Sequence, residues 1–339
     1  MSGTSLDGLD ICYVRFEKAD QWKYEILKAE TLPYNDIWED KLRNAVHLNA
    51  VDFCQLNVDY GFYLGQKVQE FIQKHQISNI DVIASHGQTI FHQPHHYFTT
   101  QIGDGRAIKE VTGITTIYDF RSQDVIKGGN GAPLVPIGDH LLFSEFDACI
   151  NLGGFSNISF EKEGKRIAFD ICPVNIVLNQ YAKILGFDYD QDGLLAQEGK
   201  VDNDVLNALN KLEFYRLSHP KSLGTEWLID FFLPHLTNLN PKDIFATCTQ
   251  HASTQIAEVL NKNNFKKVLF SGGGAYNSYL MNLIKAQTET EIIISDNVIT
   301  DFKEALIFAL MGVLRLRNEV NILSSTTGSK ENHSSGLLV

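Results

Sequence analysis

The chain has 339 residues, of which 44% are apolar and 21% charged, and its formal net charge is −12. The composition excludes a disordered or fibrous protein, the length predicts two domains, and the acidity argues against a nucleic-acid binder, which needs clustered Lys and Arg. Five scattered cysteines without a CxxC pair, no signal peptide and no run of about 20 apolar residues predict a cytoplasmic protein without membrane contacts.

β-Branched and aromatic runs predict strands, and apolar residues at helical spacing predict helices. In chain order, the first half is predicted to contain strands 9–16 and 24–29, helix 58–75, and strands 80–84 and 115–118. The second half is predicted to contain strands 148–152, 157–160 and 167–169, helix 176–185, strand 268–270, helix 279–286, strand 292–294 and helix 301–317. Two mixed α/β lobes are therefore expected, with the Gly/Pro-rich segment 128–136 as the crossover between them.

Three glycine-rich turns follow or join predicted strands and are candidate phosphate loops. The first offers N–H groups, hydroxyls and carboxylates, and the carboxylates suit Mg²⁺ directly or through water. The third stands between a strand and a helix, an arrangement that places nucleotide groups at a helix N-terminus. Plain hairpins and close strand–helix packing are the alternatives. The candidates are Gly3, Thr4, Ser5, Asp7, Gly8 and Asp10 in the first turn, Asn151, Gly153 and Gly154 in the second, and Gly272, Gly273 and Gly274 in the third.

Asp170 is the candidate catalytic residue, because a carboxylate at the mouth of an apolar strand can take a proton from water or a sugar hydroxyl. Its alternative role is to cap the helix predicted at residue 176. Arg121 is a candidate contact for an anionic substrate group, with a surface ion pair to Asp119 or Asp124 as the alternative. The histidines near His86 are a poor metal site, since their spacing is irregular and no acidic partner lies among them.

Taken together, ten ordered segments and the tail resemble the anhydro-N-acetylmuramic acid kinases, a branch of the sugar kinase/actin/Hsp70 superfamily. They are MSGTSLDGLD (1–10), SHGQT (85–89), DFRSQDV (119–125), GGNGAPLVP (128–136), NLGGFSNIS (151–159), FDICPVN (169–175), DQDG (190–193), PKSLG (220–224), SGGGAYN (271–277), KEALIFALMG (303–312) and SSTTGSKENHSSG (324–336). One departure is that Ile171 and Val174 stand where many members have smaller residues.

The resemblance implies an actin-like ATPase (ribonuclease H-like) fold with two lobes, each a five-stranded mixed sheet flanked by helices. The N-terminal lobe is expected at 1–127 with the tail, about 318–339, and the C-terminal lobe at 128–317. The implied reaction uses ATP and Mg²⁺ to open the 1,6-anhydro ring of anhydro-N-acetylmuramic acid with water and to phosphorylate O6. A homodimer is the assembly that the family suggests.

Within that reaction the resemblance assigns Asp170 as the base that deprotonates the attacking water. Glu304 is expected to orient the water, although a capping box formed with Asp301 explains this residue equally well. The sugar is expected to contact His86, Gln88, Arg121, Pro173 and Asn175, and ATP to contact the three glycine turns. The rivals are another small-molecule kinase of the superfamily, a non-catalytic ATP-binding protein and an inactive relative.

The opening loop, residues 1–10, needs an anchor on both sides to hold phosphates accurately. The strand predicted at 9–16 supplies only one of these anchors. We therefore expect the natural chain to extend upstream of Met1 by a short apolar strand of about five to six residues.

Overall fold

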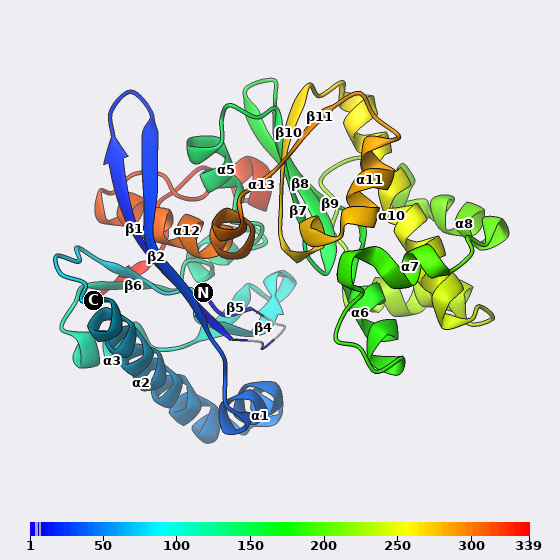
Figure 1. Cartoon of the computed structure of the whole chain (residues 1–339). Helices are drawn as coiled ribbons and strands as arrows, with labels where there is room; N and C mark the ends of the chain where they lie inside the picture. The colour runs from blue at the N-terminus through cyan, green and yellow to red at the C-terminus, as the bar shows by residue number, and fades with distance from the viewer. Residues whose placement is uncertain (4–5, 7) are drawn as a thin grey trace. The chain divides into compact units, whose positions relative to one another are not determined.

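The computed structural model describes residues 1–3, 6 and 8–339, which cluster into two compact units (Figure 1). Unit 1 comprises Met1–Leu142 and Phe302–Val339, and unit 2 comprises Phe143–Asp301. The chain passes from unit 1 to unit 2 after Leu142, which is later than the expected boundary at residue 127. It returns to unit 1 after Asp301, which is earlier than the expected boundary at residue 318. Packing explains the difference, because Lys303 pairs with Asp139 in a buried ion pair and so joins α12 (Asn297–Leu316) to α5 (Pro136–Leu142) within unit 1.

Unit 1 contains two hairpins and a three-stranded sheet among its described residues. β1 (Leu9–Lys18) pairs with β2 (Trp22–Leu32), and β4 (Gln88–Gln93) pairs with β5 (Phe98–Ile102), both antiparallel. The sheet has the order β12 (Leu337–Leu338), β6 (Thr116–Tyr118) and β3 (Ile83–Ala84). One continuous five-stranded sheet was expected here. It is divided in two because the described residues supply no strand that joins β1 to β3.

Helices of unit 1 pack against these strands around an apolar core. They are α1 (Asp36–Asn44), α2 (Ala50–His75), α3 (Gly105–Thr112), α4 (Ser122–Ile126), α5 and α13 (Ser324–Thr327), with 3₁₀ turns at Ala45–His47 and Pro94–His96. α2 begins earlier than the predicted residue 58, because Asn49 accepts hydrogen bonds from the N–H groups of Val51 and Asp52 and caps the helix there. The core includes Leu9, Leu42, Leu56, Tyr60, Tyr63, Leu64, Ile102 and Ile108.

Unit 2 is built on one five-stranded mixed sheet, as the resemblance implies. Its order is β11 (Glu291–Ile294), β10 (Lys267–Ser271), β7 (Ala148–Leu152), β8 (Phe155–Lys162) and β9 (Lys165–Pro173). β7, β8 and β9 form an antiparallel meander, whereas β10 runs parallel to β7 and to β11. The strands predicted in this half are therefore confirmed, although β8 and β9 are longer than predicted.

The helices of unit 2 bury one extensive apolar core against this sheet, with Leu152, Phe160, Phe232, Phe245 and Phe270 among its members. They are α6 (Asn175–Ile184), α7 (Leu194–Glu198), α8 (Asn203–Asn210), α9 (Thr225–Trp227), α10 (Pro241–Asn263) and α11 (Ser278–Lys285), with a π-helical turn at Leu228–Phe232 and 3₁₀ turns at Gln191–Gly193, Glu213–Arg216, Leu233–Leu236 and Gly273–Tyr276. Among the described helices, none combines the length and apolar character that a membrane crossing requires.

The start of α12 differs from the prediction. The helix begins at Asn297, and the carboxylate of Asp296 accepts a hydrogen bond from the N–H of Ile299 at 2.8 Å, so Asp296 caps it. Asp301 lies inside the helix and bonds to the hydroxyl of Tyr276 instead. The predicted capping box of Asp301 and Glu304 is therefore wrong. The alternative role of Glu304 as part of a helix cap is removed with it.

Candidate functional site

The opening loop of unit 1 is tied down at its described ends. Met1 and Asp10 exchange two backbone hydrogen bonds of 2.7 and 2.9 Å, and Ser2 forms an antiparallel bridge with Leu9. A Cβ at Gly8 would lie 2.8 Å from the carbonyl oxygen of Leu32, so only glycine fits beside this strand. Thr4, Ser5 and Asp7 lie outside the described residues.

A chain of hydrogen-bonded hydroxyl groups supports the start of this loop. The hydroxyl of Ser2 bonds to that of Tyr34 at 2.7 Å, and Tyr34 bonds in turn to Tyr60 at 2.6 Å. Ser2 also donates to the side-chain oxygen of Gln88 on β4. Gln88, predicted as a substrate contact, is thus placed behind the loop as a support for Ser2. Sequence reasoning missed Ser2, Tyr34 and Tyr60.

The candidate residues Arg121 and His86 form one hydrogen-bonded unit. Arg121 Nε donates to His86 Nε2 at 2.9 Å, and its Nη1 donates to the carbonyl of Gly131 at 2.7 Å. Because a guanidinium N–H can only donate, His86 Nε2 must carry a lone pair. The proton therefore resides on His86 Nδ1, which lies 2.8 Å from the carbonyl oxygen of Gly87. Both ring nitrogens are engaged, so His86 positions Arg121 rather than exchanging protons.

This arrangement predicts that His86 stays neutral, because burial and the charge of Arg121 hold its pKa well below the usual value. In ¹⁵N spectra of histidine-labelled protein, we expect one imidazole signal to remain that of the Nδ1–H tautomer from pH 5 to pH 9. His86→Gln, which keeps an acceptor for Arg121, assigns the signal by removing it. An imidazole that titrates near its ordinary pKa of about 6.5 would contradict the assignment.

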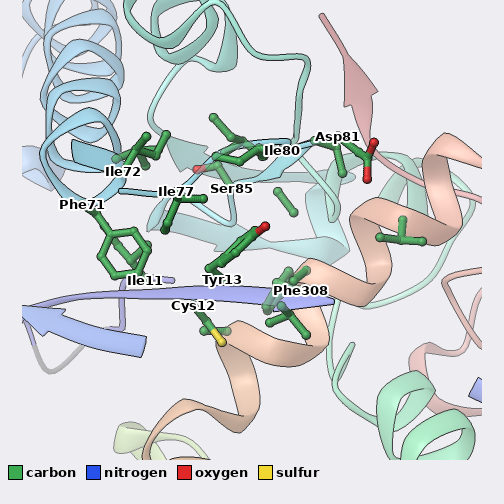
Figure 2. Close-up of a pocket in the computed structure, with 18 of the residues that line it drawn as sticks. Ile11, Cys12, Tyr13, Phe71, Ile72, Ile77, Ile80, Asp81, Ser85 and Phe308 are labelled. Atoms are coloured by element: carbon green, nitrogen blue, oxygen red, sulfur yellow. The ribbon is translucent and has the colours of Figure 1, made fainter. Parts of the chain in front are cut away.

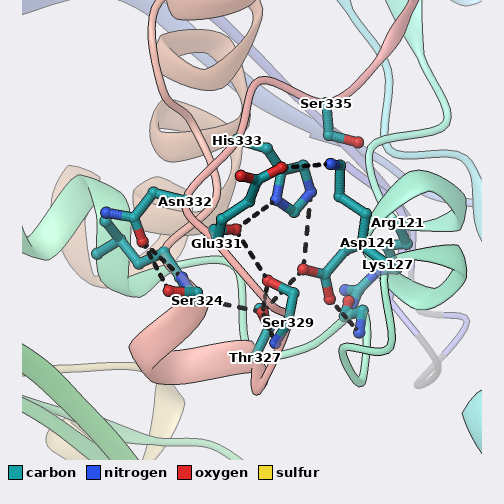
Figure 3. A network of polar contacts seen from close by, with 12 residues as sticks. Arg121, Asp124, Lys127, Ser324, Thr327, Ser329, Glu331, Asn332, His333 and Ser335 are labelled. Carbon is teal, nitrogen blue, oxygen red and sulfur yellow. Dashed lines mark hydrogen bonds and ion pairs between the residues drawn. The ribbon is translucent and has the colours of Figure 1, made fainter.

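A polar network next to Arg121 fastens the C-terminal segment to α4 (Figure 3). The buried carboxylate of Asp124 accepts hydrogen bonds from the N–H of Gly131 at 2.7 Å and from the hydroxyl of Thr327 at 2.8 Å, and His333 Nε2 lies 3.7 Å away. Asp124 thereby holds Gly131, whose carbonyl orients Arg121. The predicted alternative for Arg121, a surface ion pair with Asp119 or Asp124, does not describe Asp124, which is fully buried and accepts hydrogen bonds from Gly131 and Thr327.

Glu304 is a carboxylate on α12 whose electrostatic surroundings are set by unit 1. Desolvation by the surrounding protein raises its pKa, whereas the positive charges of Arg121 and the Met1 ammonium oppose that rise. Glu304 also raises the pKa of Arg121 against the effect of burial. The candidate acid and the candidate anion contact of unit 1 are therefore electrostatically coupled.

In unit 2 the second and third glycine turns lie against each other at the carboxyl ends of β7 and β10. Ser271 and Asn151 are register partners there, and Gly272 has a positive φ of 84°. A Cβ at Gly272 would lie 2.5 Å from Asn151 Oδ1, and one at Gly274 would lie 2.8 Å from the Cβ of Leu152. Glycine is required at both positions. This edge of an open sheet is where ligands characteristically bind.

The predicted contact Asn175 links the second of these turns to the start of α6. Its side-chain amide donates to the carbonyl of Leu152 at 3.3 Å, and its backbone N–H donates to that of Gly153. The N–H groups of Val174 and Ile176 donate to the carbonyl of Gly154 at 2.8 and 3.1 Å. The second turn, the third turn and the start of α6 therefore pack together.

Asp170 lies within β9 rather than after the strand, because β9 continues to Pro173. Asn157 pairs with Asp170 and Ser156 with Cys172, which leaves Ile171 as the extra residue of a β-bulge. Bulges characteristically redirect side chains next to functional sites. The helix cap proposed as an alternative for Asp170 is wrong, since α6 starts at Asn175 without a side-chain cap.

The carboxylate of Asp170 is held by the loop around residues 220–224. Its Oδ2 accepts from the N–H of Leu223 at 2.8 Å, and its own N–H donates to the carbonyl of Lys221. Burial raises the pKa of Asp170, and the bond from Leu223 limits the rise. A half-buried carboxylate with one fixed oxygen is suited to accept a proton at the other. Lys221 and Leu223 were not named as site residues, although their PKSLG segment was recognised.

The two residues that depart from the family pattern beside Asp170 point away from it. Ile171 and Val174 are each 2% exposed and belong to the apolar core of unit 2. Their larger side chains therefore fill the core instead of the surroundings of the carboxylate. Among residues 1–3, 6 and 8–339, no group of three or more His, Cys, Asp and Glu gathers as a metal site.

One family model and its curated relatives match this chain over nearly its whole length. A family model described as anhydro-N-acetylmuramic acid kinase matches residues 1–339. Proteins of that description from Hydrogenovibrio crunogenus and Zymomonas mobilis are 33% and 35% identical, with 97% of this chain covered and 93% and 95% of theirs. Among solved structures, the activator of the 2-hydroxyisocaproyl-CoA dehydratase from Clostridium difficile with bound ADPNP aligns with a TM-score of 0.37 and 17% identity over 63% of this chain and 84% of its own.

Proposed function

This chain belongs to the anhydro-N-acetylmuramic acid kinase family, and on that premise we propose that it phosphorylates 1,6-anhydro-N-acetylmuramic acid with ATP. The product is N-acetylmuramic acid 6-phosphate, formed in the recycling of cell-wall sugar. The observation that carries the proposal is the family match over residues 1–339. The bulged, half-buried carboxylate of Asp170 supports it with a group suited to the chemistry.

We assign Asp170 as the general base. A water molecule gives its proton to Asp170 while its oxygen forms a bond to the anomeric carbon of the sugar. The bond from that carbon to O6 breaks, and O6 takes its electron pair and then bonds to the γ-phosphorus of ATP as ADP leaves. Since O6 departs as an anion, the reaction needs no second strong base. Glu304 orients the water, and Arg121 faces the lactyl carboxylate of the sugar, supported by His86.

ATP is assigned to the glycine turns, because backbone N–H groups in turns of this kind can bind phosphate oxygens. In unit 2 these are Asn151, Gly153 and Gly154 with Gly272, Gly273 and Gly274, the last three on the adenosine side. In unit 1 they are Gly3, Thr4, Ser5 and Gly8. Asp7 and Asp10 would hold Mg²⁺ directly or through water, since carboxylates are its preferred ligands. Mg²⁺ bound there would neutralise charge on the transferred phosphate.

The packing of the two glycine turns predicts a defined effect of one added methyl group. Gly274→Ala places a Cβ within 3.0 Å of the carbonyl oxygen of Leu152 and pushes the turns apart. We expect the Kd for ATP, measured by calorimetry, to rise about 10-fold, the equivalent of one lost hydrogen bond. Gly273 is the matched control for the turn, because a Cβ there meets no atom within 4 Å and its alanine variant should retain the parent Tm. Unchanged ATP affinity in Gly274→Ala would place ATP elsewhere.

The decisive experiment for the reaction is incubation with ATP, Mg²⁺ and the anhydro sugar in ¹⁸O-water. The proposal requires one ¹⁸O atom at the anomeric hydroxyl of the 6-phosphate product and none in the phosphate. Unlabelled product would eliminate attack by water. Turnover of glucose, N-acetylglucosamine or acetate in preference to the anhydro sugar would reassign the substrate.

We further propose that the enzyme acts in the cytoplasm as a homodimer. Five free cysteines fit a reducing compartment. The assembly rests on the family resemblance, and light scattering of the purified protein measures it directly.

A further inference from the structure

The guanidinium of Arg121 is held by two hydrogen bonds, which leave one of its nitrogens for a ligand. Nε donates to His86 Nε2 at 2.9 Å, and Nη1 donates to the carbonyl of Gly131 at 2.7 Å. Nη2 donates to no acceptor among residues 1–3, 6 and 8–339. A guanidinium recognises a carboxylate best through two parallel N–H groups, so recognition depends on how accurately the two tethers set its plane.

The two tethers of Arg121 are supported in different ways. His86 bonds to the carbonyl of Gly87 and otherwise packs on Phe308, with the ring centres 4.7 Å apart. Phe308 in turn lines a cavity of about 700 Å³, whose other lining side chains are mostly apolar (Figure 2). Apolar packing is non-directional, so it restrains the imidazole less sharply than hydrogen bonds do. Gly131 is therefore the tether that other segments of the chain control through hydrogen bonds.

Gly131 is held in place by Asp124. The N–H of Gly131 donates to Asp124 Oδ2 at 2.7 Å, and the N–H of Gly129 donates to the backbone carbonyl of Asp124 at 2.9 Å. A Cβ at Gly129 would collide with Asp124 Oδ2, and one at Gly131 would lie 2.8 Å from a methyl group of Val125. The turn therefore wraps closely around Asp124. Because Asp124 is 0% exposed, its carboxylate must find its hydrogen bonds inside the protein.

Thr327, the last residue of α13 in the C-terminal segment 324–336, supports both Asp124 and the turn (Figure 3). Its hydroxyl donates to Asp124 Oδ1 at 2.8 Å, and its carbonyl accepts from the N–H of Asn130 at 2.7 Å. In the part of the chain that the structure describes, no other hydrogen-bond donor reaches Oδ1, since His333 Nε2 stands 3.7 Å away. The orientation of the Asp124 carboxylate therefore depends on the hydroxyl of Thr327.

We propose that Thr327 is a positioning residue for Arg121, and that the C-terminal segment thereby sets the preference of the enzyme for a sugar that carries a carboxylate. The inference rests on the proposed function, in which Arg121 faces the lactyl carboxylate. Without the Thr327 hydroxyl, Asp124 Oδ1 loses its donor, the carboxylate turns toward other partners, and the peptide of Gly131 follows it. Arg121 then binds an anion less well, whereas the groups that recognise the rest of the sugar keep their places.

The kinetic test compares Thr327→Val with the parent on two sugars. One is 1,6-anhydro-N-acetylmuramic acid, and the other is 1,6-anhydro-N-acetylglucosamine, which has a hydroxyl in place of the lactyl ether. We expect KM for the first sugar to rise about 10-fold with little change in kcat, and both constants for the second to stay within about 2-fold. Thr327→Ser keeps the hydroxyl and should behave like the parent. An equal change on both sugars, or no change on either, would overturn the proposal.

Thr326→Val is the matched control for a buried hydroxyl in the same segment. Thr326 is 6% exposed, and its hydroxyl lies near the carbonyls of Leu323 and Pro133 instead of Asp124. The ratio of kcat/KM for the two sugars should therefore equal that of the parent. If Thr326→Val loses as much discrimination as Thr327→Val, the effect belongs to the folding of the segment and the positioning role is wrong.

A second measurement does not depend on turnover. The Nε–H of Arg121 donates to His86, so its ¹H–¹⁵N signal in arginine-labelled protein reports how firmly the guanidinium is held, and Arg121→Lys assigns the signal by removing it. We expect Thr327→Val to speed the exchange of this proton with water about 10-fold, and Thr327→Ser and Thr326→Val to leave it unchanged. Unchanged exchange in Thr327→Val would overturn the proposal. If the parent phosphorylates neither sugar, the proposed function fails, and the exchange measurement still decides whether Thr327 positions Arg121.

Discussion

Replacing Asp170 by asparagine is expected to lower kcat for the anhydro sugar by about 10³-fold while leaving the Kd for ATP unchanged. The size follows from the usual contribution of a general base, about 10²–10⁴-fold. Asparagine keeps an oxygen for the N–H of Leu223, so the bulge and the loop around residues 220–224 should persist. The measurement is product formation in single turnover, with ATP affinity measured separately. Full activity in the variant would remove Asp170 from the mechanism.

The pH dependence provides an independent check on Asp170. A base acts only when deprotonated, so activity is lost as the pH falls through the pKa of Asp170. Burial places that pKa above the ordinary value of about 3.9, and the acidic limb of the kcat/KM profile should lie correspondingly higher. The pKa of Glu304 is raised as well, so the limb is assigned by comparing Asp170→Asn with Glu304→Gln.

Stability separates a catalytic role of Asp170 from a structural one. Because its folded-state pKa is raised, the native protein binds the proton more tightly than the unfolded chain does. The free energy of unfolding therefore falls as the pH rises from the unfolded pKa through the folded pKa. Asparagine is uncharged throughout, so the variant should be at least as stable as the parent at pH 7. A lower Tm would indicate that Asp170 is retained for folding.

Lys303→Met is expected to be the most destabilising single change outside the proposed site. Lys303 Nζ lies 2.7 Å from Asp139 Oδ1, and the two side chains are only 6% and 5% exposed. Removing one member of a buried ion pair typically costs about 3–5 kcal/mol, because the remaining charge stays desolvated. In a unit of this size that corresponds to a fall in Tm of about 10 °C, measurable by calorimetry.

Two controls distinguish the buried charge from the loss of a lysine. Lys242→Met removes the partner of Glu198 from a pair whose side chains are 52% and 58% exposed, and its Tm should change by about 1 °C or less. The double variant Lys303→Met with Asp139→Leu removes both charges and should recover most of the lost stability. If Lys303→Met and Lys242→Met lower Tm by the same amount, the prediction that the buried ion pair is the more important one for stability is wrong.

Much of the fold could be predicted because local patterns were strong. The alternating residues of β1 and the apolar runs of β7 and β10 identified these strands directly. α10 was missed, although Asn240 and Pro241 supply the cap and first-turn signals of a helix start. Its buried residues include polar side chains such as Thr247, His251 and Gln255 as well as apolar ones, so the face pattern that usually reveals a helix is weak. The start of α12 was misplaced because Asp296 and Asp301 are both plausible caps.

The sequence by itself determined the family and selected the glycine turns and Asp170 as candidates, because these depend on short ordered motifs. Only the tertiary structure decided what each side chain contacts, because hydrogen bonds between distant segments leave no local pattern. It placed Gln88 behind Ser2, fixed the tautomer of His86 through Arg121, and set Asp170 on a bulge under Leu223.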